Sequence, residues 1–201
     1  MKNIFIVLVM VVVVAFAFIF PKFKDAQRAK RMNDWYEKQY GAFGKTAEAI
    51  LSHDNGTNGF LLLGALHYRI EQKAKARGED SLTDTERRLL AAFWVEAEVN
   101  NGGFDQYFFN SAGNNAETAL AGLKEMDAVG AAALLERAMT VFPSGKPPAD
   151  RFKRQEVMQQ IAEMSEPLWD QCDKEFYNLK ENVSQLAFAY AKKKKVEIVL
   201  P

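Results

Sequence analysis

Apolar and polar residues follow a helical period over most of the chain. Between Glu117 and Lys180, apolar residues recur three and four positions apart, which is the spacing of one face of an α-helix. No stretch of the body alternates with a period of two, so the pattern predicts an all-α single domain. The predicted helices cover residues 25–52, 60–77, 84–99, 104–110, 117–126, 129–142, 151–164, 166–180 and 182–193.

Several residues mark the predicted ends of these helices. Thr83 and Glu86 have the spacing of a capping box, in which each side chain accepts a hydrogen bond from the other residue's backbone N–H. Gly78 lies where a glycine often ends a helix. Pro167 suits the first turn of a helix, so we expect a break just before it. The tail from Val196 to Leu200 is predicted to be a short strand or disordered.

The first part of the chain has a different pattern. Every residue from Ile4 to Phe20 is apolar, a run of seventeen, which spans roughly 26 Å as a helix and approaches the thickness of a bilayer core. We therefore predict a transmembrane anchor over residues 1–24. The alternative is a signal peptide cut after Ala15-Phe16-Ala17, which has the small-x-small form.

Basic residues near this run predict its orientation. They are more numerous after the run than before it, where Lys2 stands alone, so the positive-inside tendency favours a single-pass inner-membrane protein with a cytoplasmic body. An exported body is the alternative. The basic residues that follow the run are Lys22, Lys24, Arg28, Lys30 and Arg31.

Charge divides the chain further. Residues 32–190 carry sixteen Lys and Arg against twenty-four Asp and Glu, whereas residues 191–201 carry four Lys against one Glu. An acidic body argues against nucleic acid as a direct ligand. We predict a helical juxtamembrane region at 25–79, a helical domain at 80–190 and a basic tail at 191–201, whose lysines can contact anionic lipid.

The residue types needed for common reaction chemistry do not cluster. Cys172 is the only cysteine, and His53 and His67 lie fourteen positions apart without grouped carboxylates, so neither a disulfide framework nor a metal site is predicted. Asp170 and Asp173 flank the cysteine and should raise its pKa. We find no phosphate-binding loop and no nucleophile elbow, and predict a non-enzyme without cofactors.

One stretch between two predicted helices stands out, NNGGFDQYFFNSAG at residues 100–113. Gly102 and Gly103 are expected to allow a tight turn. The aromatic residues after the turn are expected to pack against the helix that holds Phe93 and Trp94, and the asparagines at both ends to satisfy backbone groups at helix ends. The candidate structural or binding residues are Asn100, Asn101, Gly102, Gly103, Phe104, Gln106, Tyr107, Phe108 and Asn110.

Two glutamates precede this stretch in an unexpected place. Glu96 and Glu98 lie near the C-terminal end of their helix, where cations are favoured over acids. We therefore expect them to pair with an arginine or with the following loop.

Residues 98–104, EVNNGGF, followed by Gln106, Tyr107, Phe108 and Asn110, resemble the DNA-mimic-protein domain family, and the resemblance covers residues 80–185. It implies an all-helical domain, a possible homodimer, whose surface carboxylates imitate DNA phosphates and occupy the DNA-binding face of a regulator. The locally basic stretch 151–154 and the predicted anchor depart from that pattern.

Three hypotheses about function follow. The first is a membrane-anchored, non-catalytic module of this family that binds a protein partner. The second is an acidic DNA mimic that sequesters a DNA-binding protein. The third is a hydrolase or small-ligand-binding domain that uses the loop from Asn100 to Asn110, where backbone amides at a helix start can hold an anion.

Overall fold

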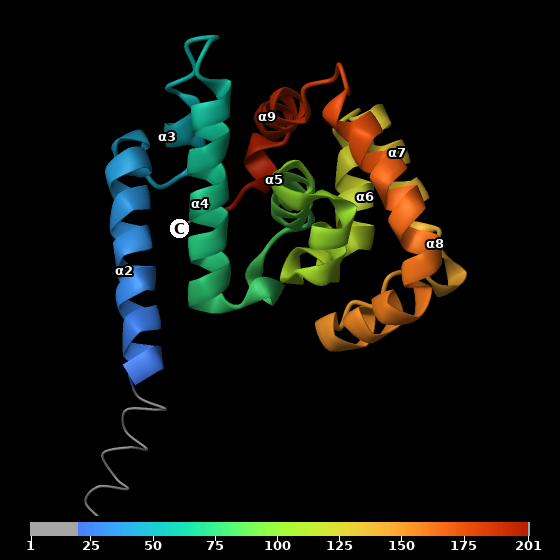
Figure 1. Cartoon of the computed structure of the whole chain (residues 1–201). Coiled ribbons are helices and arrows are strands. Elements are labelled where there is room, and N and C mark those ends of the chain that lie inside the picture. The colour runs from blue at the N-terminus through green and yellow to red at the C-terminus, as the bar shows by residue number, and fades with distance from the viewer. Residues whose placement is uncertain (1–19, 201) are drawn as a thin grey trace, which may run out of the picture. The chain divides into compact units, whose positions relative to one another are not determined.

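The computed structural model describes residues 20–200, and within this range every regular element is a helix (Figure 1). The prediction of an all-α fold is confirmed. The α-helices are α2 (Phe20–Tyr40), α3 (Ala47–Leu51), α4 (Gly59–Arg77), α5 (Asp84–Phe109), α6 (Ala116–Glu125), α7 (Val129–Met139), α8 (Arg151–Tyr177) and α9 (Val183–Lys193). Short 3-10 turns cover Gly41–Phe43, Glu79–Ser81, Ser111–Asn115, Pro143–Gly145 and Lys195–Glu197.

The chain divides into two compact units, Met1–Ala42 and Phe43–Pro201. The predicted anchor at 1–24 falls mainly outside the described residues. From residue 20 onward, no helix is both long enough and apolar enough to cross a bilayer. The predicted domain limits at 79 and 190 stay predictions.

The helix predicted over residues 25–52 is wrong in its length. Helix α2 ends at Tyr40, and Gly44 then takes a φ of +90°, which a residue with a side chain rarely adopts. Helix α3 starts afresh at Ala47, where the Thr46 side chain accepts a hydrogen bond from the backbone N–H of Ala49. A left-handed glycine therefore separates two helices that the periodic pattern had joined.

Helix α5 is the central element of the second unit and packs against α4, α6, α8 and α9. Its residues Phe104, Tyr107 and Phe108 are fully buried. The ring of Phe108 lies 4.9 Å from that of Phe142 and 5.3 Å from that of Trp169, between ring centroids. The predicted packing partner, the helix that contains Phe93 and Trp94, is wrong, because that helix is the first half of α5 itself and the ring partners come from α8 and from the turn after α7.

Helix α8 runs without interruption through Pro167, so the predicted break before this residue is wrong. Pro167 has no N–H to donate to the carbonyl of Glu163. Both residues are exposed, and water can satisfy that carbonyl. Ile161 and Trp169 are buried on the packed face, and their contacts keep the two halves of the helix in line.

The segment after α9 is neither the short strand nor the disordered tail that the sequence predicted. It forms the 3-10 turn Lys195–Glu197 and continues to Ile198, which is 5% exposed. The predicted capping box at the start of α5 is confirmed, with both of its hydrogen bonds present. Its Glu86 is fully buried and also forms an ion pair with Lys73 of α4 at 2.7 Å.

The two histidines have different surroundings. His53 is exposed, whereas His67 is buried between α4 and α5 with its ring 4.2 Å from that of Phe93. Burial lowers the pKa of His67 to about 3. Since the pKa is below that of an unfolded histidine, this residue stabilises the fold fully above about pH 6.5, and the contribution is lost as the pH falls toward 3.

Replacing His67 should make the protein less sensitive to acid. Between pH 6.5 and 5 the unfolded chain gains a proton at this residue, which removes about 2 kcal/mol of stability from the wild type. We expect His67→Leu to lose this part of the pH dependence, measured by urea unfolding at each pH. The matched control is His53→Gln, which removes a histidine without touching the core. Identical pH profiles for His67→Leu and wild type would contradict the assignment.

Candidate functional site

The motif singled out in the sequence forms a kink within α5. The backbone is helical through Asn101, leaves helical geometry at Gly102 (φ −164°, ψ 25°) and Gly103 (φ 77°, ψ −176°), and is helical again from Phe104. The predicted loop of four residues is thus a break of two. The positive φ of Gly103 favours glycine, because other residues avoid this region of backbone space.

Helix α8 satisfies the backbone groups that the kink leaves open. The carboxylate of Asp173 accepts a hydrogen bond from the N–H of Phe104 at 2.8 Å. The hydroxyl of Tyr177 donates to the carbonyl of Val99 at 3.0 Å. Asp173 and Tyr177 are one helical turn apart, so a single turn of α8 caps both sides of the break.

The amides after the kink are held by a glutamate before it. The Glu98 carboxylate accepts hydrogen bonds from Gln106 Nε2 at 2.6 Å and from Asn110 Nδ2 at 2.9 Å. Glu96 instead accepts from the hydroxyl of Ser184 at 2.5 Å. The expectation that the two glutamates pair with an arginine or with the following loop is confirmed for Glu98 and wrong for Glu96, whose partner Ser184 belongs to α9. The side chain of Asn110 serves the Glu98 bridge rather than a helix end.

The remaining candidate residues differ in exposure. Asn100, Asn101 and Gly102 are on the surface. Tyr107 is buried, its pKa is raised by burial, and its hydroxyl has no hydrogen-bond partner in the part of the chain that the structure describes. The glycine and aromatic residues at 103, 104, 107 and 108 therefore belong to the core, whereas the first three residues of the motif, with Asp105 and Phe109, face outward.

Arg154 fixes the end of α5. Its guanidinium is fully buried and donates to the carbonyls of Phe108 at 2.6 Å, Pro148 at 2.6 Å and Asn110 at 2.8 Å. The C-terminal end of a helix carries partial negative charge, which favours a cation there. Of the locally basic stretch 151–154, Arg154 is thus withdrawn from the surface, and no signal in the sequence marked it as buried.

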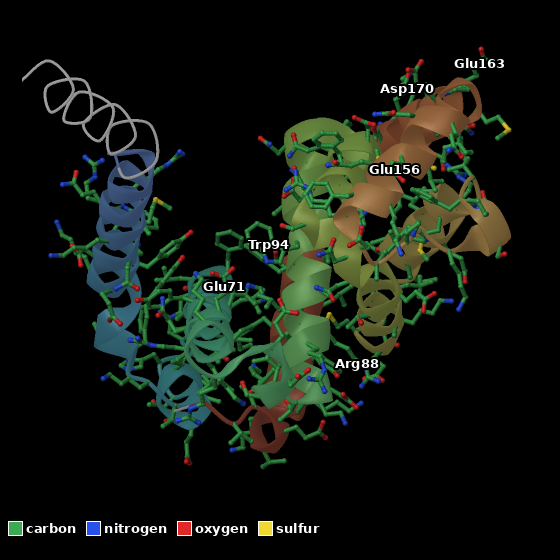
Figure 2. The ribbon with its side chains drawn as sticks, turned by 90° about the horizontal axis from the view of Figure 1, so that it is seen from below. Glu71, Arg88, Trp94, Glu156, Glu163 and Asp170 are labelled. Atoms are coloured by element: carbon green, nitrogen blue, oxygen red, sulfur yellow. The ribbon has the colours of Figure 1, made fainter. Side chains whose placement is uncertain are left out.

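The exposed side of α8 carries the largest group of unpaired acids. Glu156, Glu163 and Asp170 are seven residues apart and lie along one face of the helix (Figure 2). We call these three residues, with Glu166, the acidic row. Across residues 27–200 no ion-pair partner is found for any of the four, although Lys153 and Lys174 are exposed on the same helix.

Outside the acidic row, nine of the nineteen acids of the second unit have cationic partners within residues 27–200, including the buried Glu86, and the exposed acids without one are spread over separate segments of the chain. The acidic row is distinct because its four exposed acids share one helix. The described pairs are Glu71–Lys75, Asp84–Arg87, Glu125–Arg88, Glu136–Lys124, Glu175–Arg137, Glu117–Lys146, Asp54–Lys192 and Glu197–Lys194. Next to the row, the pKa of Asp173 is raised by burial and by the charges of Asp170 and Asp105. Negative charge therefore accumulates where α8 meets the kink.

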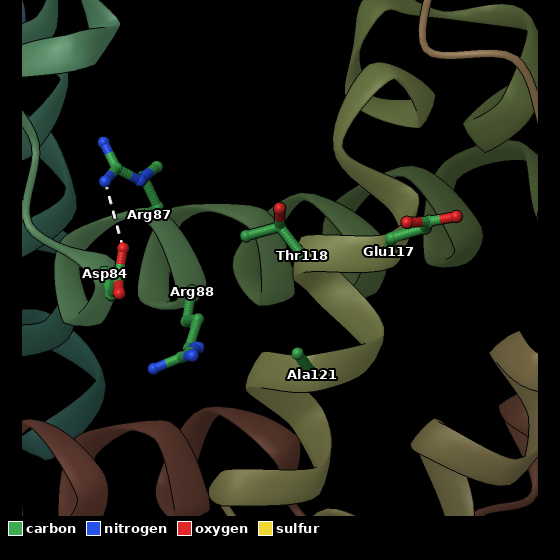
Figure 3. Close-up of a pocket in the computed structure, with 6 residues that line it drawn as sticks. All are labelled: Asp84, Arg87, Arg88, Glu117, Thr118 and Ala121. Atoms are coloured by element: carbon green, nitrogen blue, oxygen red, sulfur yellow. Dashed lines mark hydrogen bonds and ion pairs between the residues drawn. The ribbon is translucent and has the colours of Figure 1, made fainter.

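Two surface depressions of the second unit are candidates for a ligand site. One of about 270 Å³ lies between the start of α5 and α6, where Asp84 and Arg87 form an ion pair at 3.0 Å (Figure 3). A second, of about 410 Å³, lies between the loop at 54–60 and α9. No group of three or more His, Cys, Asp or Glu residues able to hold a metal occurs within the described range.

Cys172 is buried beneath α7. The Nε of Arg137 donates a hydrogen bond to its sulfur at 3.2 Å. The pKa of the thiol is raised, as expected, but burial is the largest cause and the neighbouring acids contribute less. A buried thiol with a raised pKa is a poor nucleophile.

Comparison with known proteins gives one match. The profile of a protein family described as DMP19-like protein matches residues 80–194, which is more than half of the chain. No curated protein and no solved structure matches the sequence.

The kink should tolerate no side chain at residue 103. A Cβ on Gly103 would collide with the carboxylate of Asp173. Gly78 is a matched control, since its φ of +85° is similar but a Cβ there would meet open space. We expect Gly78→Val to cost about 1–3 kcal/mol through backbone strain, and Gly103→Val to cost more than about 4 kcal/mol in thermal or urea unfolding. Equal losses for the two variants would show that Asp173 does not confine Gly103.

Proposed function

Because the chain belongs to the DMP19-like protein family, we propose that it is a non-catalytic module that binds a protein partner through the acidic row of α8. The family supports a DNA-mimic-like role in protein interaction. The observation that carries the proposal is that four exposed acids without an ion-pair partner in residues 27–200 lie together on a single helix. Unpaired charge of one sign favours a partner with a surface of the opposite sign.

The helix gives the acidic row a regular spacing. Glu163, Glu166 and Asp170 follow at intervals of three and four residues, or about 4.5 and 6 Å along a helix axis. One strand of DNA carries a charge about every 3.4 Å along its axis. The acidic row is thus a sparser line of negative charge than a DNA strand. Its sign is opposite to that of a basic protein surface, which favours binding to one.

The second candidate function is DNA mimicry in the strict sense, in which the partner is a DNA-binding protein. One observation favours it. The basic stretch 151–154 argued against mimicry, but the charge of Arg154 is withdrawn into the core. The cations that remain exposed on α8 lie toward its two ends, at Lys153 and Lys174, so the acids between them face a partner without interruption.

The loop from Asn100 to Asn110 is less suited to bind an anion. The N–H of Phe104, at the start of the second half of α5, already donates to the carboxylate of Asp173. The amide of Gln106 is held by Glu98. An anion at this helix start would have to displace one carboxylate and approach another, so the geometry does not support the hydrolase or ligand-binding alternative.

Removing the charge of the acidic row should weaken partner binding. The variant is the triple change Glu156→Gln, Glu163→Gln and Asp170→Asn in the full chain, tested by pull-down and quantified with the recovered partner. We expect at least about a tenfold loss of affinity, and weaker wild-type binding as salt rises. If DNA fragments compete with the partner, the second candidate function holds.

The matched control removes three exposed acids that have partners elsewhere, through Asp84→Asn, Glu117→Gln and Glu136→Gln. Its net charge equals that of the triple variant of α8. Equal affinity of both triple variants for the partner would contradict a site on α8, because the effect would then follow net charge alone.

We also propose that the apolar run from Ile4 to Phe20 anchors the module in the inner membrane with its body in the cytoplasm. The length of the run and the basic residues after it support this. A fluorescent protein fused after residue 201 should then fluoresce, whereas alkaline phosphatase at the same place should be inactive. Active phosphatase would show that the body is exported.

A further inference from the structure

Residues 195–200 lie against the end of α4 and the first turn of α5. Four hydrogen bonds join the segment to side chains of these helices. The side chains belong to Lys73 of α4 and to Thr83, Thr85 and Glu86 of α5, and we call these four residues the strap groove.

Two residues of the strap groove form hydrogen bonds with the backbone of a single residue of the segment, Val199. The N–H of Val199 donates to Glu86 Oε1 at 2.8 Å, and the carbonyl of Val199 accepts from Lys73 Nζ at 2.9 Å. Lys73 Nζ and Glu86 Oε2 are 2.7 Å apart. A buried ion pair thus supplies one donor and one acceptor to the backbone of a single residue, as a neighbouring β-strand would.

The two residues before Val199, Glu197 and Ile198, are also held in place. Thr85 donates its hydroxyl to the Glu197 carboxylate at 2.5 Å, and Thr83 donates to the carbonyl of Glu197 at 2.8 Å. Ile198 is 5% exposed, whereas the side chains of Val196 and Val199 are 81% and 57% exposed. The groove therefore selects an acid followed by an aliphatic residue and leaves the next position free.

The groove does not need the segment to hold its shape. Glu86 Oε2 also accepts from the backbone N–H of Thr83 at 2.9 Å, which is half of the capping box that starts α5. Its pairing with Lys73 is likewise independent of the segment. Since helix α5 positions the acceptor and α4 the donor, the groove is organised before any peptide enters.

We propose that the strap groove is a binding site for an extended peptide of the form acid–aliphatic–any residue, and that the chain's own residues 197–199 occupy it and compete with a partner peptide. The occupant is defined by the segment already in place, whose acid, aliphatic side chain and backbone each have a partner in the groove. This site lies on α4 and α5 and does not depend on the function proposed for α8.

The test uses the full chain and a fluorescein-labelled peptide of residues 194–201 as the probe. The variant Ile198→Asp should release the chain's own segment, because a charged side chain would not stay in the buried position of Ile198. We expect the variant to bind the peptide at least about tenfold more tightly than wild type does, by fluorescence anisotropy. A folded variant that fails to bind the peptide would overturn the proposal.

The matched control is the same peptide methylated on the backbone nitrogen of Val199, which loses the N–H that Glu86 accepts. It should bind at least about tenfold more weakly, and equal binding of the two peptides would overturn the assigned site. If Ile198→Asp does not fold, hydrogen exchange of the wild type decides. The amide of Val199 should exchange at least about tenfold faster than that of Val95 in α5, and equal rates would mean that the segment never leaves the groove.

Discussion

The burial of Arg154 is the constraint on which the rest of the second unit depends. A guanidinium without a carboxylate partner is costly inside a protein unless its donors are satisfied. Here it donates to backbone carbonyls of Phe108, Asn110, Pro148 and Ala149 and to the side chain of Asn114. One side chain of α8 therefore joins the end of α5, the following 3-10 turn and the loop before α8. The packed face of α8 is set by this contact, and so is the face that remains for solvent.

A second attachment between the same helices lies nineteen residues further along α8, where Asp173 caps the kink. Between the two attachments the helix passes through Pro167 without a break. Because α8 is fixed at both places, the acidic row presents its charges at constant spacing. A surface that is already ordered loses little conformational entropy on binding, which favours recognition by charge.

Structural features that depend on neighbouring residues were predicted from the sequence, whereas features that depend on distant residues were missed. The capping box of Thr83 and Glu86 and the bridge from Glu98 join residues a few turns apart. Spacing pointed to the first, and the position of an acid near a helix C-terminus pointed to the second. The burial of Arg154 and the docking of Ile198 depend on residues that are far away in the chain. The continuity of α8 was missed because exposure of Pro167, and not its position in the sequence, decides whether the helix survives.

The kink of α5 links two residues that are 69 positions apart. The carboxylate of Asp173 occupies the space where a side chain at residue 103 would otherwise lie. Glycine at 103 thus serves the kink in two ways, because it adopts the positive φ and leaves the space through which Asp173 reaches the N–H of Phe104. A larger residue at 103 would therefore be penalised twice, by the backbone conformation and by the carboxylate, and a smaller residue at 173 would relieve only the second penalty.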